Sequence, residues 1–121
     1  MYIYRFLNKN REIIYIGSTK NIYNRISNQH FSNSGHLEPK QYSQVDIVEY
    51  AKVSESSDRL LLENYLITKI KPPFNKREKK YTDEIYSNII SEVNNLNWIK
   101  YEQESFFKRK NVNCRTRFRT S

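Results

Sequence analysis

The stretch YIYRFLNKNREIIYIG, residues 2–17, decides the fold that we expect for this chain. Apolar and aromatic side chains alternate with other residues over positions 1–7, and apolar residues dominate again over positions 13–17. Alternation with a period of two predicts β-strands. The residues between them, 8–11, are all polar and predict a turn, so the two strands should form a hairpin.

The register of this hairpin determines whether its tyrosines meet. If the hairpin closes symmetrically about the turn, Tyr4 lies opposite Tyr15 and Tyr2 lies opposite Gly17. Directly opposed side chains on neighbouring strands have Cβ atoms ~5 Å apart. We therefore expect two phenols side by side on one face of the sheet, whereas a slip by one residue would separate them.

A helix, a loop and a third strand are expected after the hairpin. Ser18 and Thr19 predict the cap of a helix over about residues 21–31. Residues 32–44 are mostly polar and contain a glycine and a proline, so we expect a loop that carries function. Alternation returns over residues 45–53 and predicts the third strand.

Two further helices follow. Ser56, Ser57 and Asp58 predict the cap of a helix that ends near Ile70, with a buried stripe of Leu60, Leu62, Leu66, Ile67 and Ile70. A last helix should begin after a cap at residues 82–84 and bury Ile85, Ile89, Val93 and Leu96. This order predicts an α/β fold of the α+β kind: a small three-stranded, mostly antiparallel sheet flanked by helices.

The composition favours one small polar domain that binds a polyanion. The chain has 121 residues and a mean hydropathy of −0.87, which suits one compact domain. A net charge of +8 favours DNA, RNA or an anionic membrane as partner. The sequence has no apolar run of bilayer length and no apolar N-terminal segment, so we expect no membrane partner. With 1 cysteine and 2 histidines, zinc sites and disulfides are disfavoured and a cytoplasmic location is expected.

Glu63 is the most informative single charge. It falls inside the apolar arc of its predicted helix, where a carboxylate must be neutralised, paired or bound to a metal. An ion pair with Arg59 is the structural alternative. The other candidates also have structural explanations: packing for Tyr4 and Tyr15, a solvated helix position for Arg25, and a turn for Asn75.

Taken together, these motifs resemble the GIY-YIG nuclease family. They occur in the order Tyr2-Ile3-Tyr4, Tyr15-Ile16-Gly17, Arg25, Glu63 and Pro73-Phe74-Asn75. The resemblance covers residues 1 to about 76, and its most specific part is residues 61–67 followed by residues 71–75. Tyr2 departs from the family, whose motif begins with glycine, but a glycine at a strand edge is the least chemical part of that motif.

The resemblance implies a catalytic domain over residues 1–76, extended by a helix and a basic tail over residues 77–121. It also implies hydrolysis of DNA phosphodiester bonds with one divalent ion, Mg²⁺ or Mn²⁺, bound by Glu63. Arg25 would hold a phosphate oxygen, and Asn75 would brace the loop after the Glu63 helix. One tyrosine would take a proton from the attacking water, and we prefer Tyr4 with Tyr15 hydrogen-bonded beside it.

The histidines leave an alternative open. The family often places a His or Tyr one helical turn after the arginine, but here Gln29 holds that position and His30 follows it. On an ideal helix Gln29 shares the face of Arg25, and His30 does not. Either the helix distorts and His30 belongs to the catalytic set, or His30 is not the equivalent residue; His36 is a second candidate.

Basic residues are expected to contact DNA around the site and beyond it. The sequence from residue 105 to the end contains no acid and is predicted to be a DNA-binding arm. The expected contacts are Lys20, Arg25, Lys108, Arg109, Lys110, Arg115, Arg117 and Arg119. Single-stranded DNA, branched DNA and RNA all stay open as substrates, as does the oligomeric state.

Two other function classes compete with the nuclease. One is a catalytically inactive nucleic-acid-binding module of the same fold, and the other is a small basic protein of a ribonucleoprotein. Neither would need Glu63. The resemblance further implies a prokaryotic or viral source and a role in restriction, repair or mobile-element chemistry, and the sequence does not choose among these.

Overall fold

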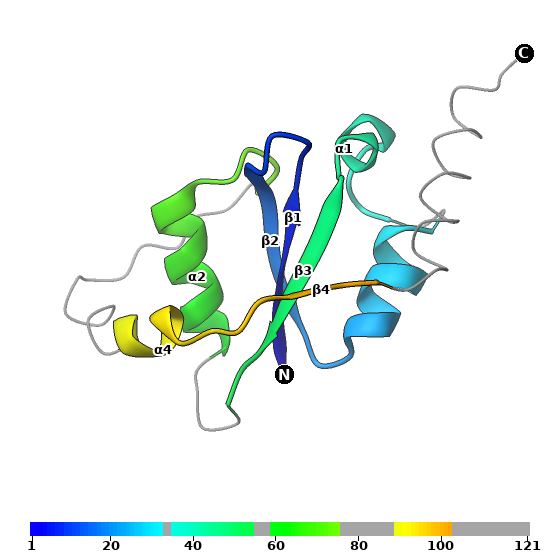
Figure 1. Ribbon diagram of the computed structural model, residues 1–121. Helices are drawn as coiled ribbons and strands as arrows, with labels where there is room; N and C mark the ends of the chain where they lie inside the picture. The colour runs from blue at the N-terminus through cyan, green and yellow to red at the C-terminus, as the bar shows by residue number, and fades with distance from the viewer. Residues whose placement is uncertain (33–34, 55–58, 76–88, 103–121) are drawn as a thin grey trace, which may run out of the picture.

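Four antiparallel strands form one sheet at the centre of the protein (Figure 1). The computed structural model describes residues 1–32, 35–54, 59–75 and 89–102. The strand order is β2-β1-β3-β4, with bounds β1 Tyr2–Leu7, β2 Ile13–Thr19, β3 Ile47–Lys52 and β4 Ile99–Lys100. The expected α+β architecture is confirmed, with β4 as a fourth, very short strand that the sequence pattern did not predict.

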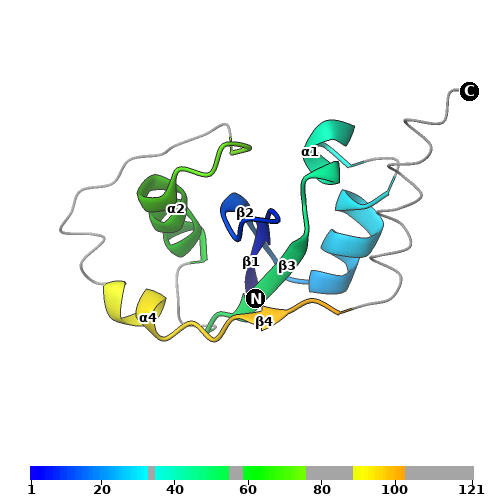
Figure 2. The same ribbon diagram turned by 45° about the horizontal axis from the view of Figure 1, so that its top comes forward.

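Helical segments cover both faces of this sheet (Figures 1 and 2). On one side lie α2 (Arg59–Ile70) and α4 (Ile90–Asn94). On the other lie the π-helical segment η1 (Asn24–His30), drawn in cyan, and α1 (Pro39–Ser43). Within the described residues, no helix combines the length and apolar character needed to cross a membrane.

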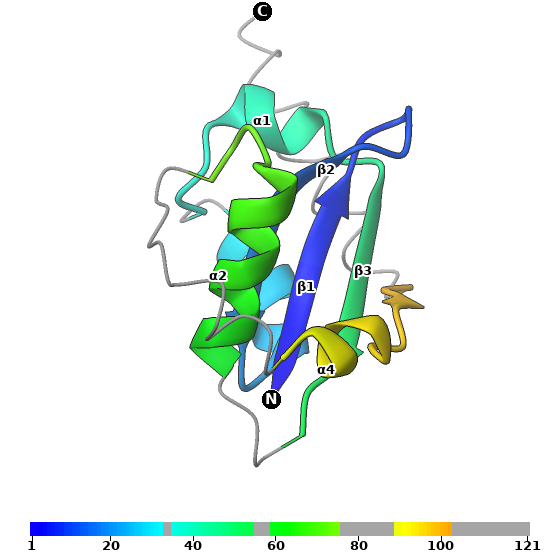
Figure 3. The same cartoon turned by 90° about the vertical axis from the view of Figure 1, so that its left-hand side faces the viewer.

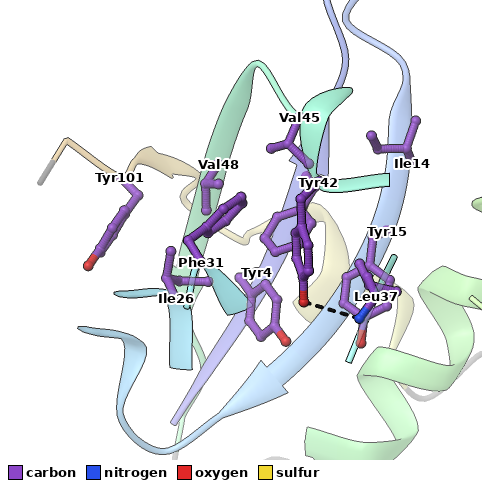
Figure 4. Packing of buried hydrophobic residues seen from close by; sticks show 11 residues of the cluster. Tyr4, Ile14, Tyr15, Ile26, Phe31, Leu37, Tyr42, Val45, Val48 and Tyr101 are labelled. Carbon is purple, nitrogen blue, oxygen red and sulfur yellow. Dashed lines mark hydrogen bonds between the residues drawn. The ribbon is translucent and has the colours of Figure 1, made fainter. Parts of the chain in front are cut away.

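Each face of the sheet has its own buried cluster. The cluster beneath η1 and α1 is rich in aromatic rings and includes Tyr4, Phe6, Tyr15, Phe31 and Tyr42 (Figure 4). The cluster beneath α2 is mostly aliphatic and includes Ile3, Ile16, Val53, Leu62, Leu66 and Ile67. The polar tips of the tyrosines make the first cluster the one that can carry chemistry.

The predicted hairpin register is wrong by two residues. Tyr4 pairs with Gly17, and Phe6 pairs with Tyr15. The connection is one residue longer than expected, so that Leu7 pairs with Ile13, because the Asn8 side chain accepts hydrogen bonds from two backbone N–H groups within it and Arg11 adopts a left-handed conformation with φ 65°. A β-bulge between Phe6 and Leu7 adds the second residue of the shift and brings Ile14 into the same buried cluster as Tyr15. From Phe6 back to Tyr2, the shift by two residues keeps the side chains on their expected faces. Tyr4 and Tyr15 are therefore diagonal neighbours, with ring centroids 6.2 Å apart.

The register also explains why a glycine occupies position 17. The Tyr4 ring lies over Gly17, and a Cβ there would fall on the atoms of that ring. The sequence predicted that the second strand ends at Gly17, but β2 continues to Thr19 and Gly17 lies inside it. In the structure, the absence of a side chain provides the space that the phenol fills.

Several other expectations need correction. The expected loop at residues 32–44 contains helix α1, which begins with Pro39 and a capping box between Glu38 and Gln41. Leu60 and Ile70 are 61% and 40% exposed, because they lie in the first and last turns of α2, where the apolar arc is no longer covered. The expected caps at residues 56–58 and 82–84, Ile85 and the basic tail lie outside the described residues.

Candidate active site

The hydroxyl of Tyr4 connects the other side chains of the site. Its side chain is 0% exposed, and its hydroxyl lies 2.6 Å from Nε2 of His30. Nε of Arg25 donates a hydrogen bond to the same hydroxyl at 3.2 Å. Strand β1 thus presents one phenol to two residues of η1, and the three side chains form one connected group.

The π-helical geometry of η1 allows Arg25 and His30 to reach the same hydroxyl. Its hydrogen bonds span five residues, as in the bond of 2.9 Å from the Phe31 N–H to the Ile26 carbonyl. This wider turn brings residues i and i+5 to one face. Gln29 stays exposed and accepts a hydrogen bond from Arg25 at 2.6 Å. Of the two alternatives left open by the sequence, the structure shows the distorted helix, and it places His30 inside the site.

Tyr15 forms the side of the site that faces a cavity. Its hydroxyl lies 3.2 Å from Nε2 of His36, a residue at the exposed surface. The cavity has a volume of about 350 Å³. It is lined by Tyr15, His36, Leu37, Glu38, Gln41, Glu63, Ile67, Phe74 and Asn75. Tyr4 is absent from this lining, so the two tyrosines occupy different environments.

Glu63 reaches the cavity from α2, which packs beside β2 and β1 (Figure 3). Its side chain is half-buried, and its carboxylate accepts a hydrogen bond from the Ser18 hydroxyl on β2. Among the described residues, Glu63 makes no ion pair with Arg59. The carboxylate in the apolar arc is therefore held by a neutral donor and stays directed toward the cavity that Tyr15 also lines.

Asn75 joins the segment after α2 to the free edge of β2. Its amide accepts a hydrogen bond from the Ile16 N–H at 2.9 Å and donates one to the Ile16 carbonyl at 2.8 Å. The Phe74 N–H adds a third bond to the Ile14 carbonyl at 3.0 Å. Lys71, with φ 54°, lets the chain turn back after the helix. The segment thus closes the cavity wall and satisfies the strand edge.

Burial controls the protonation of the aromatic and imidazole groups. Burial raises the pKa of Tyr4 far above its ordinary value, and the nearby Tyr15 raises it further. Burial also raises the pKa of Tyr15, against the lowering effect of the Arg25 charge. Burial, with help from Arg25 and His36, lowers the pKa of His30 to about 3. His30 is therefore a neutral imidazole at physiological pH.

The sequence missed two residues that hold the site together. Ser18 looked like a helix cap, but its hydroxyl binds Glu63. Tyr42 lay in a stretch expected to be a loop, but its hydroxyl lies 2.9 Å from Nδ1 of His30 and accepts a bond of 3.2 Å from the Leu37 N–H (Figure 4). No local pattern distinguishes either residue, because both contacts join segments that are distant in the chain.

Some expected contributors are not brought to the site by the described structure. Lys20 is exposed just after β2, and no described contact links it to the cavity. The basic residues from Lys108 to Arg119 lie outside the described residues. Over the described ranges no three or more His, Cys, Asp or Glu side chains are grouped so that they could hold a metal ion. The cavity beside Tyr15 is lined by two carboxylates, Glu63 and Glu38, and of these Glu63 is the half-buried one.

Comparison with known proteins agrees with this geometry. The model of the GIY-YIG catalytic domain matches residues 1–81. The chain therefore belongs to the GIY-YIG family, and the class of enzyme that this family defines is an endonuclease, a phosphodiester hydrolase. No solved structure matches the chain significantly.

The similar curated proteins are much longer than this chain. UvrABC system protein C of Cytophaga hutchinsonii is 38% identical over 76 residues, which cover 60% of this chain and 13% of that protein. The protein of the same name from Chlorobium chlorochromatii is 37% identical, covering 73% of this chain and 16% of the relative. The protein of that name from Methylococcus capsulatus is 34% identical, and the match covers 78% of this chain and 16% of the relative. The chain thus spans about one sixth of their length or less.

Proposed function

We propose that this chain is a metal-dependent DNA endonuclease domain that hydrolyses phosphodiester bonds with one divalent ion. The observation that carries the proposal is the shared cavity of Tyr15 and Glu63, which places a proton-accepting phenol and a carboxylate on facing elements. Arg25 is held close by through Tyr4. The arrangement supplies a base, an anion-binding guanidinium and a cation ligand in one place.

The donor set fits a hard cation. Glu63 offers a carboxylate oxygen beside an open cavity, and Mg²⁺ or Mn²⁺ commonly binds through one or two carboxylates while waters and a phosphate complete the shell. Bound there, the ion would neutralise charge on the phosphate and on the leaving oxygen. Ser18 would keep the Glu63 carboxylate turned toward it through the hydrogen bond already described.

We assign the role of general base to Tyr15, which reverses the preference for Tyr4 stated in the sequence analysis. Tyr4 is fully buried and its oxygen already accepts from Arg25, so a water has no route to it in this structure. Tyr15 lines the cavity, and its hydroxyl faces the exposed His36, which can accept the phenolic proton. Tyr4 then orients Arg25, whose guanidinium would bind a nonbridging phosphate oxygen.

The remaining roles extend from this site. Asn75 would fix the cavity wall, and His30 would support Tyr4 from the buried side. Residues 1–76 would form the catalytic unit, and residues 77–121 would add contacts to DNA through the basic tail. We propose a cytoplasmic location and a DNA substrate, with weak sequence preference because contacts from basic side chains to phosphates carry no sequence information directly.

A plasmid assay tests the proposal. Supercoiled DNA should be nicked in Mg²⁺ or Mn²⁺ and left intact in EDTA. Glu63→Ala and Glu63→Gln should both abolish nicking while DNA affinity stays near the wild-type value, because the cation ligand is lost and the fold is not. Glu102→Ala, which removes an exposed carboxylate away from the cavity, is the matched control and should cut normally.

Two results would contradict the proposal. Cleavage that persists in EDTA would exclude the metal-dependent mechanism, and normal cleavage by Glu63→Ala would make that carboxylate structural. A protein that binds DNA tightly but never cuts it under any of these conditions would instead be the inactive binding module.

A further inference from the structure

A buried line of hydrogen bonds joins Leu37, which lines the cavity, to Tyr4 through Tyr42 and His30. The Leu37 N–H donates to the Tyr42 hydroxyl at 3.2 Å, that hydroxyl lies 2.9 Å from Nδ1 of His30, and Nε2 of His30 lies 2.6 Å from the Tyr4 hydroxyl. Tyr42, His30 and Tyr4 are 5%, 1% and 0% exposed. Water therefore does not compete for these bonds, and every proton in the line must find a partner within the protein.

The neutral His30 ring can sit in this line in two ways. With its proton on Nδ1, the ring donates to Tyr42 and accepts from Tyr4. With its proton on Nε2, the ring accepts from Tyr42 and donates to Tyr4. The tautomer of a histidine is fixed by the hydrogen bonds that its two nitrogens make, so the partners of Tyr42 and Tyr4 decide between these arrangements.

Counting donors and acceptors separates the two arrangements. The Tyr42 oxygen already accepts from Leu37, and among the described residues its hydroxyl proton has no acceptor other than Nδ1 of His30. A proton on Nδ1 would therefore leave a buried hydroxyl proton unpaired, which is costly. With the proton on Nε2, Tyr42 donates to Nδ1 and the Tyr4 oxygen accepts from His30 and from Nε of Arg25. The Tyr4 hydroxyl proton then has the neighbouring Tyr15 as its acceptor, whereas the Tyr42 proton has no such second choice among the described residues.

We propose that Tyr42 is a positioning residue, which donates to Nδ1 of His30, fixes the Nε2–H tautomer and thereby makes the Tyr4 oxygen a double acceptor. The proposal rests on the proposed function in one respect, since the group finally positioned is Arg25 beside the cavity. With both lone pairs of Tyr4 occupied by His30 and Arg25, the guanidinium is held by a fully satisfied oxygen in one orientation.

The direction in which these hydrogen bonds donate also affects Tyr15. Since the Tyr4 oxygen accepts twice, its own proton is free to point toward the neighbouring Tyr15, and hydrogen bonding with Tyr4 lowers the pKa of Tyr15. Donation to the Tyr15 oxygen stabilises its phenolate form. The line thus runs from the Leu37 amide through Tyr42, His30 and Tyr4 to the phenol that borders the cavity.

Nitrogen-15 NMR of the histidine rings reports the tautomer of His30, and thus the direction of these hydrogen bonds, without any substrate. At neutral pH, His30 of the wild-type protein should appear as one neutral tautomer with its proton on Nε2. The Tyr42 hydroxyl proton should exchange slowly and show a scalar coupling to Nδ1. The chain has 2 histidines, so a His36→Gln sample identifies the His30 signals.

Tyr42→Phe tests the positioning role. It keeps the ring that packs against Phe31 at 5.1 Å between centroids and removes only the hydroxyl. The His30 proton should leave Nε2 or become shared between both nitrogens, and single-turnover cleavage should fall about tenfold with unchanged DNA affinity, as for loss of an interaction used in the transition state. Tyr101→Phe is the matched control, because it removes another buried hydroxyl that bonds η1, through Ser27 at 2.7 Å. It should change neither readout.

The NMR and cleavage results test separate parts of the proposal. A wild-type proton on Nδ1, or a Tyr42 hydroxyl proton without coupling to Nδ1, overturns the proposal even if Tyr42→Phe does not fold. A pure Nε2–H tautomer or a wild-type cleavage rate in Tyr42→Phe overturns the positioning role. A wild-type protein with the expected tautomer and no nuclease activity would overturn the proposed function and leave the hydrogen-bonded line in place.

Discussion

At the scale of single residues, the two tyrosines differ in what their hydroxyl groups can reach. Tyr4 is enclosed by His30 and Arg25, and Tyr15 borders the cavity and His36. Tyr15→Phe should lower the single-turnover cleavage rate by roughly 10²–10⁴-fold, because a general base is lost. Tyr4→Phe should lower the rate less but cost about 1–3 kcal/mol of stability, because the buried His30 nitrogen and the half-buried Arg25 lose their partner.

Measuring both variants in parallel separates the roles. Single-turnover cleavage of one labelled duplex gives the rates, and urea unfolding gives the stabilities. Equal stability with a larger rate loss in Tyr4→Phe would restore Tyr4 as the base. Wild-type rates in both variants would reduce the pair to core packing.

His30 makes stability depend on pH in a definite direction. Its folded pKa of about 3 lies below the ordinary value of about 6.5, so the unfolded chain takes up the proton first as pH falls. The stabilisation from neutral His30 is fully present above about pH 6.5 and is lost progressively below it. His30→Gln should flatten the stability profile between about pH 7 and pH 5, and His36→Gln should keep most of the contribution of His30, because burial is the largest cause of its lowered pKa and His36 the smallest. Urea midpoints across this range provide the measurement, and an unchanged slope in His30→Gln would contradict it.

At the scale of elements, η1 shows how one extra residue is accommodated. Its π-helical turn lets His30 follow Arg25 by five positions and still meet Tyr4. Deleting the exposed Asn28 should let the segment form an α-helix with the histidine four positions after Arg25, on the same face, so cleavage should survive. Inserting an alanine after Asn28 should move the histidine off that face and abolish cleavage. Nicking assays on both variants measure cleavage. An equal loss of cleavage in both would show that the π-helical geometry itself is required.

The sequence predicted elements better than it predicted contacts. Alternation identified β1, β2 and β3, and the apolar arc of α2 correctly placed Glu63 on its covered side. The register was wrong because the length of the turn depends on the Asn8 side chain and because a β-bulge lies between Phe6 and Leu7, and alternation reports neither. Strand β4 has two residues, too few for any pattern, and it exists only through pairing with β3. The bonds of Ser18 and Tyr42 likewise arise from tertiary packing.

At the scale of the whole molecule, we expect the basic tail to contribute to DNA affinity and the cavity residues to contribute to cleavage. The net charge is +8, and the tail beginning at Lys108 contributes six cationic side chains and no acid. Truncation before Lys108 should weaken DNA binding and reduce the slope of log affinity against log salt by up to about 5, since each phosphate contact on a duplex contributes about 0.9. Cleavage at saturating DNA should persist, because every residue of the cavity is retained. Titrations at several salt concentrations provide the test, and an unchanged slope would show that the tail does not contact DNA.

The space above Gly17 has a consequence for how such chains can diverge. The Tyr4 ring occupies the volume that a side chain at position 17 would need, so substitutions at the two positions are coupled. Gly17→Ala would displace the ring and with it the bonds to Arg25 and His30. A side chain at position 17 is therefore tolerated only after a smaller residue has replaced the ring at position 4. Among descendants of this chain, an aromatic ring at 4 should always be accompanied by glycine at 17.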